Sequence, residues 1–258
     1  MKIGMCSGRY GSEGDPLGLR AASMLQEAGY DYLEVNITQF TQMDDAMFDA
    51  ACALAAQSVL PVEAGNCLFP GSISLYGDRA PILEWVKKAV GRASRLGLKA
   101  MVFGSGRART CPEGMDHAQA FAILADVLRD AAEIAAEKAI TLVVEPLNRS
   151  ETDMICTVGE GARLVRAANH PHARLLVDYF HYCRENDALA CEDIPLLAHA
   201  HCAEPEKRYC HNVMDDAFHT FLQTLRNGGY DGRISIEASG EYHEGDFLAF
   251  PALMKEFR

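Results

Sequence analysis

The chain has 258 residues, of which 49% are hydrophobic and 23% are charged, and its formal net charge is -12. Nothing in this composition requires two domains, so one domain over residues 1–258 is the simplest expectation, and no apolar run reaches the ~20 residues needed to cross a bilayer. The acidic balance disfavours nucleic acid as a partner, because such binding depends on basic surface, and a small neutral substrate fits it better.

Short apolar runs alternate with helical patterns along the chain, which is typical of parallel βαβ units. The expected strands cover Lys2–Cys6, Tyr32–Val35, Val59–Ala64, Ala100–Gly104, Thr141–Glu145, Arg174–Val177, Ala198–His201 and Arg233–Ile236. The expected helices cover Leu19–Ala28, Asp45–Ser58, the stretch from Asp78 to Gly97, His117–Lys138, Val158–Ala168, part of Asp187–Leu197, Asp216–Asn227 and Asp246–Phe257. Eight such pairs, in a chain close to the ~250 residues that this fold usually has, predict a (β/α)₈ TIM barrel.

Four successive strands of this barrel end in a residue that can bind a metal. These residues are Glu145, Asp178, His201 and Glu237. Any one of them could be an ion-paired group at a barrel mouth, but buried strands rarely end in unpartnered charge, because such charge is very costly. Since the C-terminal strand ends meet on one face, the four residues predict a shared divalent cation. Three carboxylates and one imidazole favour Mn²⁺, with Mg²⁺, Co²⁺ or Zn²⁺ as further candidates.

Other polar side chains follow these strand ends and are expected to face the same pocket. Glu151 and His181 lie just past the fifth and sixth strands. His199 lies two residues before the ligating histidine, so it points to the same side one layer deeper, where a packed, hydrogen-bonded histidine is expected. Lys207 and Arg208, after the seventh strand, either bring positive charge over a substrate or remain solvated at the surface.

The loop Gly104–Arg109 combines glycines with two arginines at the end of the fourth strand. It matches neither the Walker pattern nor the dinucleotide-binding pattern. Two interpretations stay open: a turn that binds a phosphate, and a tight turn whose arginines brace neighbouring acidic loops.

The cysteines and the first expected strand give information on the cellular location of the protein. Nine cysteines are scattered along the chain without any C-x-x-C pair, which favours reduced thiols over a disulfide framework or a structural zinc cluster. Met1–Cys6 runs directly into the first expected strand and lacks the apolar core and cleavage site of a signal peptide. Both features predict a cytoplasmic location.

Several motifs carry a resemblance to a known family. The segment from Glu145 to Glu151 resembles the E-x-x-N-R-x-E motif of the ketose 3-epimerases, which act on tagatose and psicose. Asp178-Tyr-Phe-His181 is similar to their D-x-F-H motif, His199-Ala-His201-Cys-Ala-Glu204 to their H-x-H-x-G-E motif, and Ile236-Glu237 to their final strand. The whole chain resembles the wider group of xylose isomerase-like TIM barrels. Two positions depart from the motifs: Lys207 stands where those enzymes have arginine, and Ala203 where glycine is usual.

The resemblance implies a metal-dependent sugar epimerase or isomerase that acts on an open-chain ketose through an enediolate. The metal, bound by the four strand-end residues, would acidify the C–H next to the carbonyl. Glu145 and Glu237 would be the acid and base on opposite faces of that carbon, and Glu151, His181 and either Lys207 or Arg208 would contact the substrate. A small sugar is the expected partner, with no nucleic acid and no membrane, and assembly into a homo-oligomer is left open.

Other functions fit the same residues less well or equally. An aldose–ketose isomerase or an inosose-type dehydratase shares the proton abstraction and differs in where the second proton goes. The related apurinic-site endonucleases need histidines at the ends of strands two to four, where this chain has Glu34, Asn66 and Ser105. A sugar-binding subunit without turnover would not need both Glu145 and Glu237.

Overall fold

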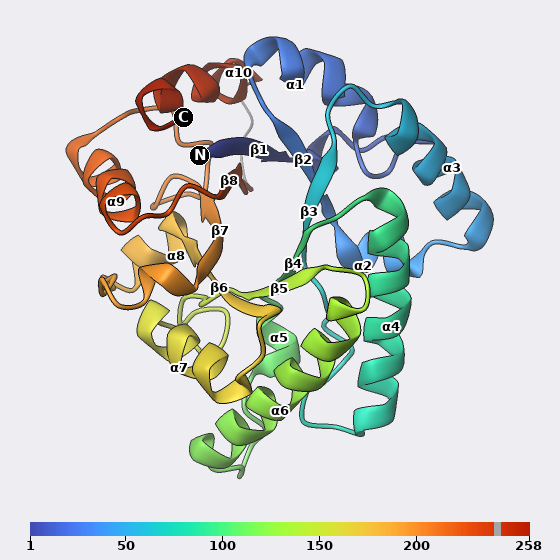
Figure 1. Cartoon of the computed structure of the whole chain (residues 1–258), viewed down its shortest axis with the longest axis vertical. Coiled ribbons are helices and arrows are strands. Elements are labelled where there is room, and N and C mark those ends of the chain that lie inside the picture. Colours follow the sequence, from blue (N-terminus) through green and yellow to red (C-terminus); the bar gives the residue numbers. More distant parts are fainter. Residues whose placement is uncertain (240–243) are drawn as a thin grey trace.

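Eight parallel strands form a closed barrel in a computed structural model that describes residues 1–239 and 244–258 (Figure 1). Each strand pairs with its neighbour in sequence, and β1 pairs with β8 to close the ring. The strands are β1 (Lys2–Cys6), β2 (Tyr32–Asn36), β3 (Val62–Asn66), β4 (Ala100–Phe103), β5 (Thr141–Val144), β6 (Ala173–Asp178), β7 (Leu197–Cys202) and β8 (Arg233–Ile236). The predicted (β/α)₈ barrel is therefore confirmed.

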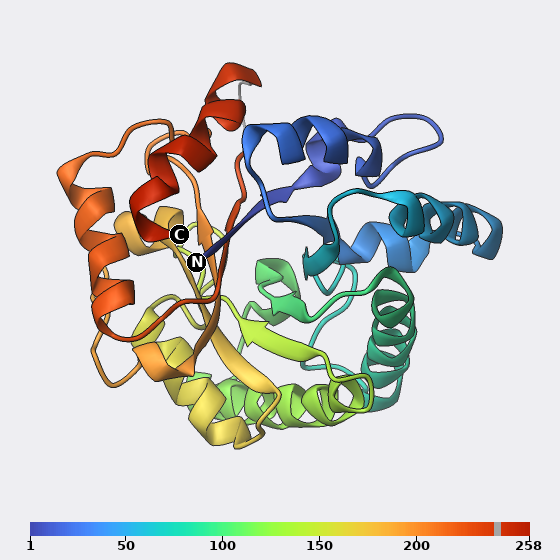
Figure 2. The same ribbon diagram turned by 45° about the horizontal axis from the view of Figure 1, so that its top comes forward.

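Helices surround the strands on the outside of the barrel, as Figures 1 and 2 show from two directions. They are α1 (Ala22–Ala28), α2 (Ile37–Gln42), α3 (Asp45–Gln57), α4 (Arg79–Leu96), α5 (Gly106–Arg109), α6 (His117–Ala136), α7 (Val158–Ala168), α8 (Tyr179–Arg184), α9 (Asp216–Asn227) and α10 (Glu244–Leu253). The two termini lie side by side, because the Met1 ammonium donates a 2.9 Å hydrogen bond to the carbonyl of Phe257. Within the described ranges, no helix is long and apolar enough to span a membrane.

Alternation along the strands separates two kinds of core. Residues that face outward, such as Leu142 and Val144 on β5, pack with the helices in one large hydrophobic cluster. Residues that face inward form small clusters inside the barrel, which are Tyr32 with Ala64 and Ala100, and Val102 with Val143 and Leu176. Successive side chains of a strand point to opposite faces, so every second residue faces the inside of the barrel. The last inward-facing residue of each strand is the one that lies at the barrel mouth.

The third strand begins later than expected. It runs from Val62, whereas Val59 is 50% exposed and lies outside the sheet. Pro61 precedes the strand, and proline has no N–H to donate to a neighbouring strand. The strand also continues two residues beyond the predicted end at Ala64, which brings Asn66 to the mouth of the barrel.

Two short helices, α2 and α8, follow directly on strands and were not expected. The last residue of each strand caps the helix: Asn36 accepts a hydrogen bond from the Gln39 N–H, and Asp178 accepts one from the Phe180 N–H. A side-chain oxygen at this position satisfies one of the free N–H groups of the first turn. With six residues each, these helices are too short to show a helical period in the sequence.

Two further boundaries differ from the expectation. The last helix divides into α10 and a 3-10 turn at Met254–Phe257, and the loop after β4 contains the helical turn α5. Helix α4 ends at Gly97 as predicted, because this residue adopts a left-handed conformation with φ of 97° that favours glycine. Asp78 holds the capping position of that helix without a side-chain capping bond.

Candidate functional site

The four predicted metal ligands lie together at the C-terminal ends of β5 to β8. One donor atom from each of Glu145, Asp178, His201 and Glu237 lies within 4.8 Å of the other three. His201 Nδ1 is 3.3 Å from Glu145 Oε1 and 3.4 Å from Glu237 Oε2. Three of the four side chains are buried, and Glu237 is partly buried. We refer to these four residues as the strand-end cluster.

The donor atoms of the strand-end cluster fit a divalent cation. Asp178 uses Oδ1 to cap α8, and its Oδ2 is buried without a hydrogen-bond partner among the described residues. Burial raises the pKa of Asp178 to about 6, against the opposing charges of Arg208 and His201. Three carboxylates in one buried place repel each other, and a dication offsets this repulsion. An oxygen-rich set with one imidazole suits Mn²⁺ or Mg²⁺ better than a structural zinc ion.

Glu34 on β2 orients the histidine of the cluster from the opposite side of the barrel. His201 Nε2 lies 3.0 Å from Glu34 Oε1, and His199 Nε2 lies 2.8 Å from Glu34 Oε2, with all three side chains fully buried. A carboxylate can only accept hydrogen bonds here, so both Nε2 atoms carry the proton. The Nδ1 atom of His201 is then the one directed at Glu145 and Glu237. This is the carboxylate–histidine arrangement that supports metal-binding histidines.

The sequence reasoning missed this role of Glu34, although it anticipated that His199 would be a packed, hydrogen-bonded residue. The sequence carried a signal for this role, because Glu34 is an acidic residue within an otherwise apolar strand. Its side chain points to the face opposite to that of Leu33 and Val35. Burial lowers the pKa of His201, but the charges of Glu34 and Glu237 outweigh it and hold that pKa well above its usual value. Similarly, burial raises the pKa of Glu34, but His201 and His199 outweigh it and lower that pKa far below its usual range.

The two glutamates of the strand-end cluster have different proton affinities. Burial, together with the charge of Glu237, raises the pKa of Glu145 to about 7. Burial acts in the same direction on Glu237, but the positive charges of His201 and Arg208 outweigh it and lower its pKa to about 2. Glu145 therefore binds a proton more tightly than Glu237 does. Two carboxyl groups with separated pKa values are what an acid and base pair requires.

His181 presents a single free donor to the cluster. Its Nδ1 accepts hydrogen bonds from the backbone N–H of Asn148 at 3.0 Å and from the Asn148 side-chain amide at 2.9 Å. The proton is therefore on Nε2, which is buried, lies 3.6 Å from Asp178 Oδ2 and has no hydrogen-bond partner in the described part of the chain. Burial and the nearby Arg208 lower the pKa of His181 to about 3, so the ring stays neutral and remains a donor.

Of the two predicted cations, Arg208 reaches the cluster. Its guanidinium lies 2.6 Å from Glu237 Oε2 and 3.4 Å from Glu151 Oε1 at the rim. The backbone of Arg208 is left-handed, with φ of 57°, which turns the side chain inward from the loop after β7. Lys207 is exposed, and its ammonium lies 5.6 Å from the ring centre of Tyr209 instead. The structure thus brings Glu151, His181 and Arg208 to the cluster and leaves Lys207 outside it.

Asn66, at the end of β3, contacts the cluster from the side opposite Arg208's loop. Its amide donates a 2.6 Å hydrogen bond to Glu237 Oε1. Glu34 lies inside β2, two residues before its end, Asn66 ends β3, and Ser105 is the second residue after β4; Ser105 Oγ accepts a hydrogen bond from a backbone N–H. These positions lack the histidines that the endonuclease hypothesis needs.

The arginines of the loop after β4 have separate roles. Arg109 is fully buried and donates hydrogen bonds to the backbone carbonyls of Phe103, Met154 and Ile155. It therefore braces the loop after β5, as one of the two interpretations anticipated, although it binds backbone oxygens and not acidic side chains. Arg107 is exposed at the surface.

Gly104 leaves space for the catalytic candidate on the next strand. A Cβ atom at this position would lie 1.9 Å from Glu145 Oε2, closer than real contacts allow, and 3.1 Å from Glu145 Cβ, which is tighter than most real contacts. Only a residue without a side chain lets the carboxylate occupy its place. The glycine of this turn thus makes room for Glu145, whereas phosphate binding was one of the two interpretations that the sequence left open for the same turn.

A cavity of about 420 Å³ opens beside the cluster, between the loops after β3, β4 and β5. It is lined by Cys67, Phe69, Gly71, Gly104, Ser105, Gly106, Arg107, Ala108, Ser150 and Glu151. Because Gly104 contacts Glu145 and Glu151 contacts Arg208, the cavity adjoins the cluster directly. Its volume suits a small ligand.

Comparison with known proteins identifies the family. The family model described as "Xylose isomerase-like TIM barrel" matches residues 22–253. The chain belongs to this family. Among curated proteins similar to this xylose isomerase-like barrel, 3-dehydro-D-guloside 4-epimerase of Escherichia coli (strain K12) is 30% identical over 118 residues, 45% of each chain. The chain thus spans less than half of that relative's length in the match. L-ribulose 3-epimerase of Methylomonas sp. (strain DH-1) is 24% identical over 228 residues, 85% of this chain and 77% of the relative.

Solved structures share the fold over almost the whole chain. The apo structure of 3-keto-D-glucoside 4-epimerase from E. coli aligns with a TM-score of 0.79 and 21% identity, covering 98% of both chains. D-psicose 3-epimerase of Clostridium cellulolyticum H10, solved with D-tagatose, aligns with a TM-score of 0.81 and 17% identity, covering 100% of this chain and 98% of that one. At these identities the likeness establishes the fold.

Proposed function

We propose that this protein is a metal-dependent sugar epimerase or isomerase that moves a proton at the carbon next to a carbonyl. The proposal rests on one observation: at the barrel mouth one donor atom from each of three carboxylates and a histidine lies within 4.8 Å of the others, and two of the carboxylates are glutamates 3.3 and 3.4 Å from His201 Nδ1. The names of the similar proteins, which are sugar epimerases, support the same class of reaction.

Glu145, Asp178, His201 and Glu237 would hold the metal, with Mn²⁺ as the first candidate. When bound, the ion supplies a Lewis acid that lowers the pKa of the C–H bond next to the carbonyl. Glu34 keeps the Nε2 proton of His201 in place, so that Nδ1 remains the atom directed at the cluster. Asn66 and Arg208 hold the carboxylate of Glu237 from two sides.

The two glutamates provide the proton transfer. Of Glu237 and Glu145, one would remove the proton and the other would return one to the opposite face of the same carbon. For the reverse reaction the two residues exchange roles. The free Nε2–H of His181 would donate to the oxygen on which charge develops, and the guanidinium of Arg208, 3.7 Å from Asp178 Oδ2, would add positive charge near that oxygen. Glu151 would hold a hydroxyl group at the rim of the site.

The cavity beside the cluster and the acidic net charge of the protein indicate the substrate class. An open-chain ketose, or a sugar derivative with a ketone, has a carbonyl for the cluster and a chain of hydroxyl groups that the cavity of about 420 Å³ can hold. An aldose–ketose isomerase or an inosose-type dehydratase would use the same cluster and the same first step. These reactions differ in where the proton or hydroxide goes afterwards, so the product distinguishes them. A sugar-binding subunit without turnover would not need both Glu145 and Glu237.

A screen in deuterium oxide tests the proposal. The full-length protein with Mn²⁺ is incubated with free ketoses, phosphorylated ketoses and keto-glycosides, and deuterium at the carbon next to the carbonyl is followed by NMR. We expect incorporation with one of these groups and an epimer as the product. An aldose product indicates the isomerase, and loss of water indicates the dehydratase. If the metal binds and no substrate in the panel exchanges its proton, the proposed reaction class is wrong.

A further inference from the structure

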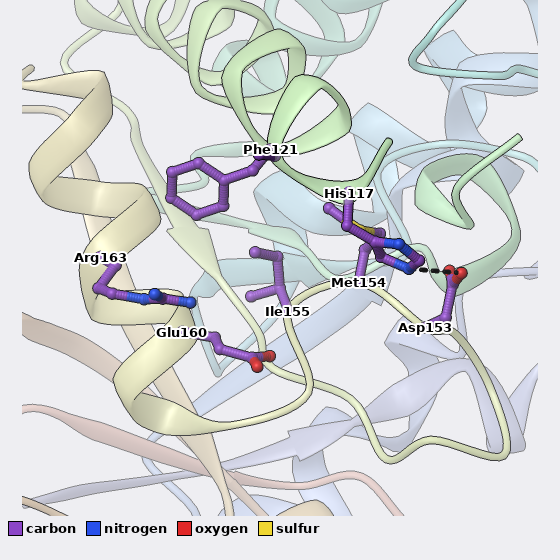
Figure 3. A pocket seen from close by; sticks show the side chains of 8 residues that line it. His117, Phe121, Asp153, Met154, Ile155, Glu160 and Arg163 are labelled. Atoms are coloured by element: carbon purple, nitrogen blue, oxygen red, sulfur yellow. Dashed lines mark hydrogen bonds and ion pairs between the residues drawn. The ribbon is translucent and has the colours of Figure 1, made fainter. Parts of the chain in front are cut away.

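A second group of metal-binding side chains lies outside the barrel mouth. Cys111 follows α5, His117 starts α6 and Asp153 lies in the loop after β5. One donor atom of each lies within 4.8 Å of the other two. His117 Nε2 is 3.2 Å from Asp153 Oδ2, and Asp153 Oδ1 accepts a 2.9 Å hydrogen bond from the backbone N–H of Cys111. Figure 3 shows His117 and Asp153 directed at each other from α6 and the loop.

Buried contacts hold the segments that carry these three residues. Arg109, two residues before Cys111, is fully buried and binds the carbonyls of Met154 and Ile155 at 3.1 Å each, next to Asp153. On the other side, Asp116 caps α6 by accepting hydrogen bonds from the N–H groups of the first turn, which fixes the position of the adjacent His117. Contacts within the chain therefore bring together donors from positions 42 residues apart. A pre-arranged set of donors lowers the cost of binding an ion.

The chemistry of the three donors selects the metal. A thiolate, an imidazole and a carboxylate form the mixed set that Zn²⁺ prefers, whereas Mn²⁺ and Mg²⁺ prefer oxygen donors. The thiolate and the carboxylate together balance the charge of a dication. The Cys111 thiol has only weak interactions to lose, since its Sγ donates to the carbonyls of Met115 at 3.4 Å and Pro112 at 3.8 Å.

We propose that Cys111, His117 and Asp153 bind a zinc ion, separate from the strand-end cluster. Asp153 and His117 also line a cavity of about 430 Å³ together with Phe121, Met154 and Arg163 (Figure 3), so water can reach the ion and complete its four ligands. The ion would join the turn after β4 to the loop after β5, which carries Glu151 two residues before Asp153. The spacing of cysteines had argued against a structural zinc site, because a site with a single cysteine leaves no pair in the sequence.

Cobalt substitution tests this proposal, because a thiolate bound to Co²⁺ gives a charge-transfer band in the near ultraviolet that oxygen and nitrogen donors do not give. The strand-end cluster contains no thiol, so the band reports an ion bound outside that cluster. The full-length protein is titrated with Co²⁺ and then with Zn²⁺. We expect one equivalent of thiolate-bound Co²⁺ per chain, displaced by Zn²⁺, in wild type and in Glu145→Gln.

Matched variants assign the band to its residues. Cys111→Ser should remove it, and the exposed His117→Gln should weaken Zn²⁺ binding by at least the ~10–100-fold that loss of a supporting partner costs. Cys191→Ser, at another exposed thiol, should leave both unchanged. Cys6→Ser examines the third group of donors, in which Cys6 lies near Glu34 and His201. A band that persists in Cys111→Ser, or that disappears in Cys6→Ser, overturns the proposal, as does Co²⁺ binding without any such band.

Discussion

The two halves of the barrel mouth contribute different kinds of residue. The ends of β5 to β8 carry the four donors of the strand-end cluster, which are Glu145, Asp178, His201 and Glu237. The corresponding positions at the ends of β1 to β4 carry residues of mixed chemistry, which are Cys6, Glu34, Asn66 and Gly104. At the barrel mouth, the second half of the chain thus supplies the four donors of the strand-end cluster that one divalent cation could share.

Contacts between the halves explain the difference. Glu34 binds His201 at 3.0 Å and Asn66 binds Glu237 at 2.6 Å. Gly104 makes room for the carboxylate of Glu145. Three positions of the first half therefore each determine where one side chain of the second half lies. We infer a division of labour in which one half carries the reacting groups and the other orients them.

The largest predicted effect is in the half that carries the reacting groups. Glu145→Gln and Glu237→Gln should each lower kcat by roughly 10³-fold, within the ~10²–10⁴-fold that a general acid or base contributes. Each amide keeps the size of the side chain but cannot exchange a proton. Turnover is measured by NMR in deuterium oxide, with thermal unfolding to verify the fold. Glu63→Gln is the matched control, because Glu63 pairs with Lys2 and Arg233 away from the cluster. Full activity in either test variant would remove the two-base reaction.

Sequence reasoning reached the second half of the barrel mouth and not the first. Asp178 and Glu237 were evident because each lies at or directly after the end of an apolar run, which is a local pattern. The roles of Glu34 and Asn66 depend on distances across the closed barrel, and no spacing within the chain encodes these distances. Similarly, the inward turn of Arg208 depends on a left-handed backbone that the sequence does not reveal.

For the fold as well, features with a local sequence pattern were predicted and features that depend on tertiary contacts were not. Helices α7 and α9 have the predicted bounds because both are long enough to show a period and start at capping residues, Thr157 and Asp215, whose side chains accept backbone N–H groups. By contrast, α2 and α8 are short and begin directly at a strand end, so a single residue serves both elements. Local patterns thus located the long elements, and tertiary packing set the short ones.

The pH dependence of metal binding tests the contact between the two halves of the barrel mouth, because Glu34 of the first half affects metal affinity through the pKa of His201 in the second half. The metal requires Nδ1 without its proton, and the raised pKa of His201 means that the proton competes already above pH ~6.5. Affinity for Mn²⁺ should therefore fall at least about tenfold per pH unit as the pH decreases, and more steeply below pH ~7, where Glu145 and Asp178 also take up protons. Isothermal titration calorimetry from pH 9 to pH 5 measures it. An affinity that stays flat between pH ~8 and ~5 would exclude His201 as a ligand.

Glu34→Gln should have the next largest effect. Loss of this carboxylate leaves the Nε2 proton of His201 without its charged acceptor, and metal affinity should drop by roughly 10–100-fold. Because the negative charge of Glu34 raises the pKa of His201, its removal should also move the pH at which affinity declines to lower values. Calorimetry on Glu34→Gln and on Glu63→Gln compares two glutamates of the first half, only one of which reaches the cluster. Equal affinities in the two variants would refute the orienting role.

Gly104→Ala should have a smaller effect. The added methyl group would lie 1.9 Å from Glu145 Oε2, so the carboxylate has to move. A displacement of 1 Å can cost ~100-fold in rate, and with partial relaxation we expect about tenfold in kcat. Gly159→Ala in α7 is the control, because a Cβ there meets nothing within 4 Å and the helix should become slightly more stable. If both variants are equally active, the space at Gly104 does not position Glu145.

Asn66→Ala should have the smallest effect, because Glu237 keeps two other partners. The Asn66 amide donates a 2.6 Å hydrogen bond to Oε1 of Glu237, while Arg208 and His201 remain on Oε2. We therefore expect a loss of roughly 3–10-fold in kcat, below the full ~1.5–3 kcal/mol of a hydrogen bond to a charged group.

Asn66→Asp tests whether the hydrogen bond that Asn66 donates, and not the volume of its side chain, positions Glu237. An aspartate of the same size cannot donate a hydrogen bond and adds a negative charge beside Glu237, so it should lower kcat more than alanine does. The same charge should raise the pKa of Glu237, which shifts the limb of the pH–rate profile that reports this residue. An alanine variant as inactive as Glu237→Gln would instead mean that Asn66 itself belongs to the reacting groups. In that case the two halves of the barrel mouth would share the chemistry, and the division between them would not hold.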